Sequence, residues 1–214
     1  MCGRFTQSKE PAKIAKRFKV DSVALEEFKK SYNIPPSSKV PVVVPTEKRR
    51  RLESAAWGLK REWAPQIINL QAEKLLKGAF KKLLSTRRCL VPADGFYEWG
   101  TRGAKKYPVH FRLKSGELFG FPAIYDEDEP KTFAIFTTTP NTVVSPVHHR
   151  MPAILLPDQE DAWLDTSQSD AEAVVKLLGP YPADLMEAYE VSPAVSSPKN
   201  DAPELILPLK GPSR

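Results

Sequence analysis

The second residue of the chain, Cys2, carries the most distinctive chemistry that the sequence offers. The chain begins Met1-Cys2-Gly3, and a small residue behind the initiator lets methionine aminopeptidase remove Met1. A chain that starts at Cys2 has an α-amine, with a pKa of about 7.7 to 8.0, beside a thiol. Such an aminothiol attacks an aldehyde through nitrogen to give an imine, then closes through sulfur to a thiazolidine. The alternative is an incidental cysteine in a disordered terminus, since chain ends are often disordered.

Three other polar residues lie in apolar or turn contexts. Asn69 ends the apolar run 67–70, where it could take part in chemistry or simply cap a following helix. Glu98 stands between Tyr97 and Trp99, so it either points to solvent or occupies a desolvated pocket that raises its pKa and keeps it a proton donor. His148 lies in an irregular stretch before an apolar strand. Its neighbour His149 must face another way, so at most one of the two enters a site.

Short motifs stand along most of the chain, at residues 1–5 (MCGRF), 32–36 (YNIPP), 57–59 (WGL), 68–69 (IN), 88–99 (RCLVPADGFYEW), 136–138 (FTT) with Asn141, and 148–152 (HHRMP). In their order and spacing these motifs resemble the SRAP family, the abasic-site processing proteins first named as SOS-response-associated peptidases.

The resemblance implies that Cys2, freed of Met1, forms a thiazolidine crosslink with the ring-opened aldehyde of an abasic site in single-stranded DNA. It implies that Asn69 positions the terminal cysteine and the sugar remnant, that Glu98 is the general acid or base, and that His148 assists imine and strand-cleavage chemistry. AP-lyase activity and reversal of the crosslink are expected as well. The residues expected to contact DNA are Gly3, Arg4, Asn33, Trp57, Lys77, Arg87, Arg88, Trp99, Thr137, Thr138 and Arg150.

The chain departs from the family pattern at two positions. Gln71 stands where the family commonly has a phosphate-binding arginine, and Arg61 stands where a proline is frequent. The first departure changes the expected contacts with DNA, for which Lys60, Arg61 and Lys74 are the nearby cations that could compensate.

Two other functions fit the same residues. A thiol peptidase would use Cys2 as nucleophile and His148 as base, acting on other chains or only on its own Met1. A single-strand-binding module would use the basic clusters and tryptophans without catalysis.

The elements that must position these residues are mostly strands. Apolar and β-branched runs predict strands at 40–44, 51–57, 66–70, 89–91, 96–99, 107–113, 118–125, 132–138, 151–156 and 187–191, with 204–207 as a further candidate. Helical spacing predicts helices over 8–18, with Ser8 as the cap, and over 22–30, 72–84, 157–164 and 169–178. Residues 100–106 predict a hairpin turn. The predicted fold is α+β, a single domain over residues 1–214 with a curved, barrel-like, mostly antiparallel sheet, a few flanking helices, and a loose tail from 209.

Composition narrows the class of protein. The 214 residues are 41% hydrophobic and 27% charged, which is typical of a globular domain. A formal charge of +6 favours an anionic partner, although solubility alone explains such an excess. No segment resembles a membrane span or secretory signal, so we expect a cytoplasmic protein, near the nucleoid or replication forks. The two cysteines and three histidines make no zinc pattern, so no metal or cofactor is expected. Nothing indicates oligomerisation, so a monomer is expected, and Cys89 is most simply a buried small apolar residue.

Overall fold

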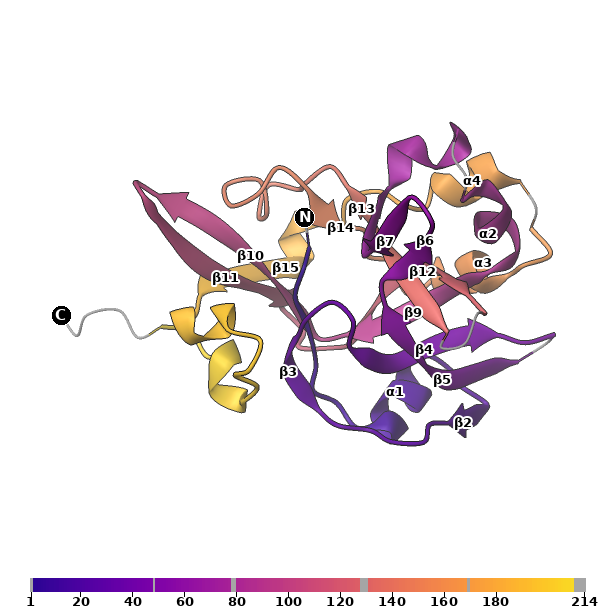
Figure 1. Ribbon diagram of the computed structural model, residues 1–214, viewed down its shortest axis with the longest axis horizontal. Coiled ribbons are helices and arrows are strands. Elements are labelled where there is room, and N and C mark those ends of the chain that lie inside the picture. The colour runs from indigo at the N-terminus through magenta and orange to yellow at the C-terminus, as the bar shows by residue number, and fades with distance from the viewer. Residues whose placement is uncertain (1, 48, 78–79, 128–130, 169, 210–214) are drawn as a thin grey trace.

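A closed β-barrel forms the centre of the molecule (Figure 1). The computed structural model describes residues 2–47, 49–77, 80–127, 131–168 and 170–209, without the side chains of 76 and 77. The barrel strands are β4 (Lys39–Pro45), β5 (Arg50–Trp57), β9 (Arg88–Ala93), β12 (Phe119–Asp126) and β13 (Thr132–Thr138). They pair antiparallel in the order β13-β12-β9-β4-β5, and a parallel pairing of β5 with β13 closes the ring. The predicted α+β fold with a curved, barrel-like sheet is confirmed.

Shorter strands extend this sheet. β14 (Met151–Pro152) and β2 (Ser22–Ala24) lie at its two ends, and β8 (Asn69–Gln71) runs parallel to β13. β6 (Leu59–Arg61) and β7 (Ala64–Ile67) form a separate hairpin between β5 and β8.

A second sheet carries the start of the chain at its interior. Its order is β15 (Met186–Glu190), β11 (Lys105–Leu113), β10 (Gly95–Arg102), β1 (Phe5–Gln7) and β3 (Ser31–Ile34). The hairpin of β10 and β11 reverses at Gly103, whose φ of 60° is a left-handed conformation that glycine adopts readily. Figure 1 shows this hairpin projecting from the body on the left.

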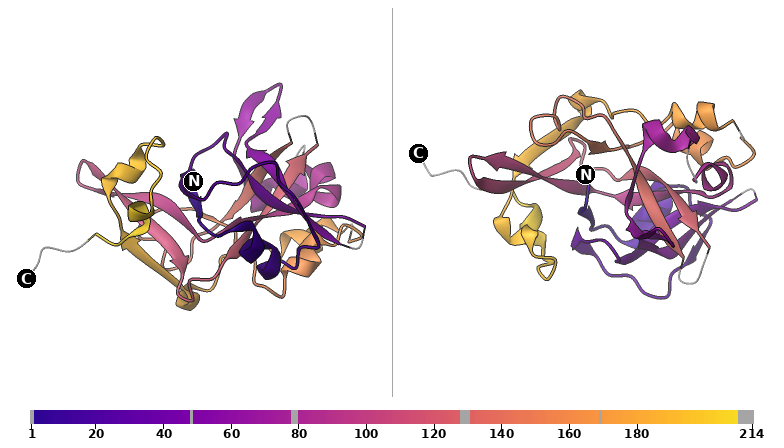
Figure 2. Two further views of the ribbon diagram at one scale, coloured as in Figure 1. Left: turned by 90° about the horizontal axis from the view of Figure 1, so that it is seen from below. Right: turned by 45° about the horizontal axis from the view of Figure 1, so that its top comes forward.

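Short helices cover the barrel and follow the second sheet. They are α1 (Pro11–Arg17), η1 (Ala72–Lys77), α2 (Lys81–Thr86), α3 (Glu160–Leu164), α4 (Ala171–Val175), η2 (Ala183–Leu185), η3 (Pro193–Ser196) and η4 (Pro203–Ile206). Both views in Figure 2 show the C-terminal segment, in yellow, beside the projecting hairpin. None of the helices described is long and apolar enough to cross a membrane. Residues 210–214, most of the predicted loose tail, lie outside the described residues.

Four local predictions are wrong. Residues 22–24 form a strand rather than the start of a helix, because β2 pairs in parallel with β5. The segment 72–84 is a 3₁₀ helix followed by α2, with residues 78–79 outside the description. The strand predicted at 151–156 ends at Pro152, and residues 203–206 form a 3₁₀ turn.

The helix α1 lacks the cap predicted for it, whereas α4 has a side-chain cap. Ser8 does not cap α1, because its backbone N–H and hydroxyl both bind the Asp94 carboxylate. Asp170 does cap α4, since its carboxylate accepts bonds from the N–H groups of Glu172 and Ala173.

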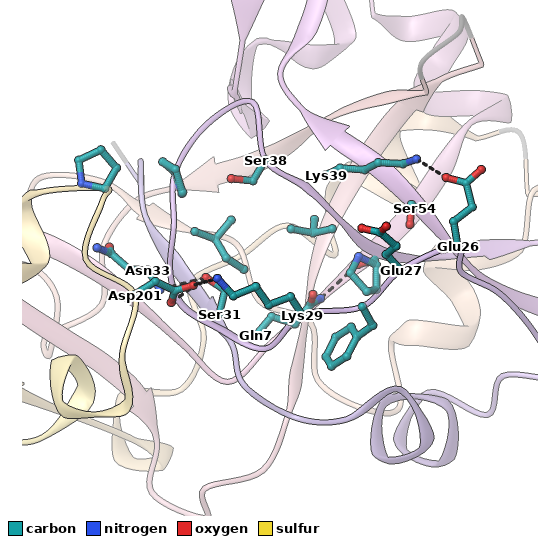
Figure 3. Close-up of a pocket in the computed structure, with 16 residues that line it drawn as sticks. Gln7, Glu26, Glu27, Lys29, Ser31, Asn33, Ser38, Lys39, Ser54 and Asp201 are labelled. Carbon is teal, nitrogen blue, oxygen red and sulfur yellow. Dashed lines mark hydrogen bonds and ion pairs between the residues drawn. The ribbon is translucent and has the colours of Figure 1, made fainter.

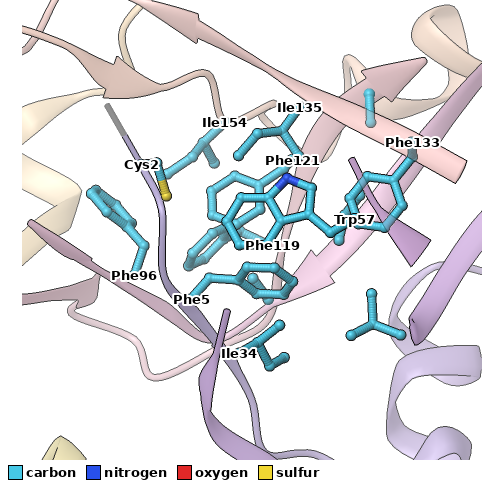
Figure 4. Close-up of a cluster of buried hydrophobic side chains, with 14 of the residues drawn as sticks. Cys2, Phe5, Ile34, Trp57, Phe96, Phe119, Phe121, Phe133, Ile135 and Ile154 are labelled. Atoms are coloured by element: carbon cyan, nitrogen blue, oxygen red, sulfur yellow. The ribbon is translucent and has the colours of Figure 1, made fainter. Parts of the chain in front are cut away.

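The larger apolar core joins the barrel interior to the second sheet and includes the start of the chain. Phe5 packs edge-on against Trp57 with ring centroids 5.0 Å apart, and against Phe121 at 5.8 Å. Cys2 belongs to the same cluster, and Figure 4 shows it at the edge beside Phe96 and Ile154. The first residues are therefore fixed by burial of large aromatic area.

Candidate functional site

Cys2 is held in place by both chain neighbours and distant residues. Its side chain is fully buried, and its Sγ lies 3.7 Å from the carbonyl oxygen of Arg4, to which the thiol donates. Phe5 continues into β1, which pairs with both β10 and β3. Burial, followed by the negative charge of Glu98, raises the pKa of the Cys2 thiol well above its ordinary value. The thiol is therefore protonated at neutral pH and lies close to Glu98.

Asn69 makes the direct contact with Cys2. Its Nδ2 donates a 2.7 Å hydrogen bond to the carbonyl oxygen of Cys2, from a position on β8 fixed by parallel pairing with Ile135. The other amide atom, Oδ1, is buried and has no hydrogen-bond partner within the described residues. Because buried polar atoms are normally satisfied, this oxygen is a candidate acceptor for a substrate group.

Glu98 is buried rather than solvated. Only 3% of the residue is exposed, and burial raises the pKa of its carboxyl to about 7. Alternation along β10 places Tyr97 and Trp99 on the opposite face of the strand. Of the two placements that the sequence allowed, the structure selects the desolvated one. A carboxyl with this pKa is both a competent acid and a competent base near neutral pH.

His148 approaches from the loop before β14. Its Nδ1 lies 3.0 Å from the backbone nitrogen of Arg150 and 3.1 Å from the carbonyl oxygen of the same residue, so the Arg150 backbone orients the ring. Desolvation lowers the pKa of His148. His149 stacks on His148 with centroids 4.4 Å apart.

Arg4 and Asn33, both predicted to contact DNA, bind one another. Arg4 Nη1 donates to Asn33 Oδ1 at 2.6 Å and to the Val195 carbonyl at 3.0 Å. Asn33 is buried, and its Nδ2 donates to three carbonyl groups of the C-terminal segment, those of Val195, Ser197 and Asn200. Arg4 stays partly exposed, whereas Asn33 fastens the C-terminal segment to β3. Gly3, between Cys2 and Arg4, is also partly exposed.

Trp57 and Arg88, both predicted to contact DNA, are large side chains buried within the fold. Trp57 is fully buried in the core, and its Nε1 donates to the Ile68 carbonyl at 3.0 Å, so it offers no ring to a nucleobase. Arg88 is also fully buried, and its guanidinium binds carbonyl groups at the ends of α2 and α3, among them Leu84 at 2.6 Å and Trp163 at 2.6 Å. Both side chains hold the fold together.

Trp99 differs from these two because it is only partly buried. Its Nε1 donates to the Ser196 hydroxyl at 3.1 Å, and Arg4 lies over its ring at 5.9 Å. It therefore lies on the face of β10 opposite Glu98.

Arg150 is committed to a neighbour in this structure. It makes two bonds to the Glu73 carboxylate, at 2.9 and 3.0 Å, and one of 2.6 Å to the carbonyl of Thr137. Thr137 and Thr138 are buried on β13, where they pair with β14. These residues connect the His148 loop to the segment that carries Asn69.

The remaining predicted cations lie apart from this group. Arg87 forms an ion pair with Glu127 and lies over the Tyr125 ring at 5.9 Å. Lys77 ends η1, and its side chain lies outside the described part of the chain.

Trp63 is a candidate that sequence reasoning missed. It is 67% exposed on the β6–β7 hairpin and borders a cavity of about 290 Å³ that Asn69, Gln71 and Lys74 also line. The sequence feature that could have identified it is its position directly after Arg61 and Glu62, because a large aromatic residue among charged residues is seldom part of the core.

A second hollow, of about 450 Å³, lies against β3 and β4 (Figure 3). Its lining includes Glu26, Lys39 and Asp201 but none of the four candidate catalytic residues. Lys39 pairs there with Glu26, and Asp201 accepts the Tyr32 N–H at 2.6 Å. This hollow is separate from the chemistry around Cys2. No cluster of three potential metal ligands occurs among the residues described.

Comparisons with known proteins identify the family of the chain. The family model for SOS response associated peptidase (SRAP) matches residues 1–198. Abasic site processing protein YoqW of Bacillus subtilis is 41% identical over 96% of this chain and 99% of its own length. Abasic site processing protein YoaM of the same organism is 38% identical over 96% of this chain and 97% of its own length. A crystal structure of a Bacteroides thetaiotaomicron protein superposes with a TM-score of 0.82 at 26% identity, over 98% of this chain and 100% of that one.

These matches extend over nearly the whole chain and include the residues that surround Cys2. The chain therefore belongs to the SRAP family, among whose members are abasic-site processing proteins.

Proposed function

We propose that the mature chain, beginning at Cys2, forms a covalent thiazolidine crosslink with abasic sites in single-stranded DNA. The observation that carries the proposal is the 2.7 Å bond from Asn69 Nδ2 to the Cys2 carbonyl, which fixes the residue that would become the reactive terminus. Pre-positioning of this kind replaces a bimolecular encounter with an oriented one. The name of the YoqW relative supports the same class of substrate.

The reaction balances without an external oxidant or reductant. The α-amine of Cys2 adds to the aldehyde carbon of the opened sugar, and loss of one water gives the imine. The thiol sulfur then adds to the imine carbon, while its proton moves to nitrogen. One C–N bond and one C–S bond form, and the net product besides the ring is water.

The thiol and Glu98 suit this sequence of proton transfers. Burial keeps the Cys2 thiol protonated, so a base must accept its proton as the C–S bond forms. Glu98, with a pKa of about 7, can accept that proton and can also protonate the departing hydroxyl during dehydration. Reversal and strand cleavage would use the same groups, with the imidazole of His148 as a second group for proton transfer.

The thiol peptidase is the weaker candidate. Peptidase catalysis needs a thiolate, and the pKa of Cys2 is raised rather than lowered. DNA without an abasic site would bind through Lys74 and the exposed Trp63, which border the same cavity and combine positive charge with an aromatic ring.

Intact mass spectrometry tests the crosslink. The protein, confirmed to start at Cys2, is incubated with a single-stranded oligonucleotide that contains one abasic site. The expected product has the summed mass less one water. Cys2→Ala and a form that retains Met1 should give no stable adduct, whereas Cys89→Ala should react normally. Failure of the wild-type protein to form any adduct contradicts the proposal, and cleavage of a peptide added in trans would favour the peptidase.

A further inference from the structure

The hairpin of β10 and β11 continues outward from Glu98 on a single face. Antiparallel pairing places Glu98 opposite Val109, Gly100 opposite Tyr107, and Arg102 opposite Lys105. Because paired residues share a face and alternate residues lie on the same side of a strand, these six residues lie on one face of the hairpin. Arg102 lies four residues from Glu98, which is about 13 Å along the strand. We call Gly100, Arg102, Lys105 and Tyr107 the hairpin face.

The C-terminal segment covers the opposite side of the hairpin. Tyr97, on that side, is clustered with Val191, Val195 and Leu205, and Trp99 packs against the same group. On the side of Glu98, Val109 belongs to the main core with Cys2, and Tyr107 packs at the rim of that core. Within the described residues, the hairpin face beyond Tyr107 is open to solvent, with Arg102 and Lys105 both exposed.

Arg102 packs over an aromatic ring of the same face. The Tyr107 ring lies across Gly100, where an added Cβ would come within 2.4 Å of the ring and would have to displace it. The guanidinium carbon of Arg102 lies 4.5 Å from the centroid of the Tyr107 ring, and Nη2 donates to Glu190 at 2.6 Å. A guanidinium in this position can stack on a nucleobase or bind a phosphate.

The two positive charges on the hairpin face are unfavourable for the stability of the hairpin. Arg102 and Lys105 stand directly opposite one another, and like charges in that position destabilise a hairpin. The ion pair between Arg102 and Glu190 is exposed and weakly held in water, so it offsets the repulsion only in part. A polyanion bound across the hairpin face would relieve the repulsion between Arg102 and Lys105. Local conflicts of this kind are expected where function overrides stability.

We propose that the hairpin face binds the nucleic-acid strand beside the lesion, with Arg102 and Lys105 on the backbone or base of a nucleotide about 13 Å from Glu98. The proposal rests on the DNA-crosslinking function proposed above for the same sheet. It assigns the flanking contact to Arg102 over Tyr107 instead of to Trp99, which lies on the covered side.

Lys105→Glu and Lys106→Glu form a matched pair of variants. The two lysines are adjacent and exposed, but Lys106 pairs with Thr101 on the opposite face. Lys105→Glu also replaces a like-charge pair by an opposite-charge pair, so a loss of binding cannot be attributed to a weakened hairpin. Affinity for an undamaged single strand of about 15 nucleotides is measured against salt in the Cys2→Ala background, which excludes crosslinking.

Lys105→Glu should weaken binding about tenfold and reduce the salt slope by about 0.7, the value for one phosphate contact on a single strand, whereas Lys106→Glu should stay within about twofold. Equal effects of the two substitutions would indicate only long-range attraction and would overturn the proposal, as would the absence of any effect.

Arg102→Gln and Arg112→Gln provide a second matched pair. Arg112 also bonds a glutamate at 2.6 Å and lies over a tyrosine ring at 5.4 Å, but on the other face of β11. Only Arg102→Gln should weaken binding to the 15-nucleotide strand. Equal losses would mean that the hairpin face has no special role.

The crosslink and the hairpin face can fail independently. Adduct formation by the wild-type protein tests the crosslink, whereas the difference in affinity between Lys105→Glu and Lys106→Glu, measured in the Cys2→Ala background, tests the hairpin face. A wild-type protein that forms no adduct with any oligonucleotide would contradict the crosslinking function while leaving a difference between Lys105→Glu and Lys106→Glu intact.

Discussion

At the scale of single residues, the polar groups around Cys2 hold atoms that are buried away from solvent. Asn69 uses its amide nitrogen on Cys2 and leaves its oxygen with no partner in the described part of the chain. Glu98 is almost completely buried at a pKa of about 7. Perturbed groups of this kind cluster at functional sites because catalysis needs proton affinities matched to the working pH.

Asn69→Ala should separate positioning from stability. Loss of one hydrogen bond should cost about 1 kcal/mol of unfolding free energy. The crosslinking rate should fall by much more, about tenfold or greater, because the terminal residue is no longer oriented. Denaturant unfolding and single-turnover crosslinking measure the two effects. A rate that follows only the loss of folded protein would contradict the positioning role.

Glu98→Gln should change both the rate and the pH dependence of stability. The carboxyl has a folded pKa of about 7 against an ordinary 4.5, so the native state binds its proton more tightly. Wild-type stability therefore falls as pH rises through this window, and the glutamine variant should lack that fall. Crosslinking should slow by about 100-fold, a typical contribution of general acid–base catalysis. Thermal unfolding across pH 4.5 to 7, with single-turnover kinetics, checks both results. An unchanged pH profile of stability would contradict the assignment.

At the scale of elements, a buried arginine joins the helices to the barrel. Arg88 begins β9 and receives its hydrogen-bond partners from the ends of α2 and α3. Since the last carbonyl groups of a helix have no partner within the helix, Arg88 acts as a shared C-terminal cap.

Arg88→Met should therefore destabilise the fold without altering the site. Several buried carbonyl groups would lose their donor, at a cost of about 3 kcal/mol or more in unfolding free energy. Arg87→Met is the matched control, because its ion pair with Glu127 is half-exposed and should change stability little. Below the unfolding transition both variants should crosslink at the wild-type rate. A selective loss of DNA binding in Arg88→Met would restore the predicted DNA contact.

At the scale of the whole molecule, His110 makes the fold sensitive to acid. It is almost fully buried on β11 beside Tyr97 and Tyr189, and burial lowers its pKa to about 4 from an ordinary 6.5. The unfolded chain binds a proton on His110 more readily than the folded chain does. The contribution of neutral His110 to the free energy of unfolding is therefore fully present above about pH 6.5 and is lost as the pH falls toward 4.

His110→Gln should remove about 2 to 3 kcal/mol of the difference in unfolding free energy between pH 6.5 and 4. Urea unfolding of both proteins at the two pH values is the measurement. Because Glu98 acts in the opposite direction over part of the same range, the comparison is best made in a Glu98→Gln background. Equal pH dependence with and without His110 would show that another group controls acid unfolding.

The sequence by itself determined which residues could react and where most strands lie. The apolar run of β13 and the turn at Gly103 are local features, so their positions follow from side-chain pattern and backbone freedom. Residues 22–24, in contrast, form a strand only because β5 supplies a partner. Pairing between segments far apart in the chain overrides local propensity.

Only the tertiary structure decided what each functional candidate touches. Cys2 and Asn69 lie 67 residues apart and meet through a single hydrogen bond. Alternation placed Glu98 and Trp99 on opposite faces, but only the C-terminal segment determined that the side of Trp99 is covered. Trp57 and Arg88 fit motifs that suggested DNA contacts and proved to be core. The physical reason is that a motif records residue type and spacing, whereas exposure and proton affinity depend on what the rest of the chain packs against it.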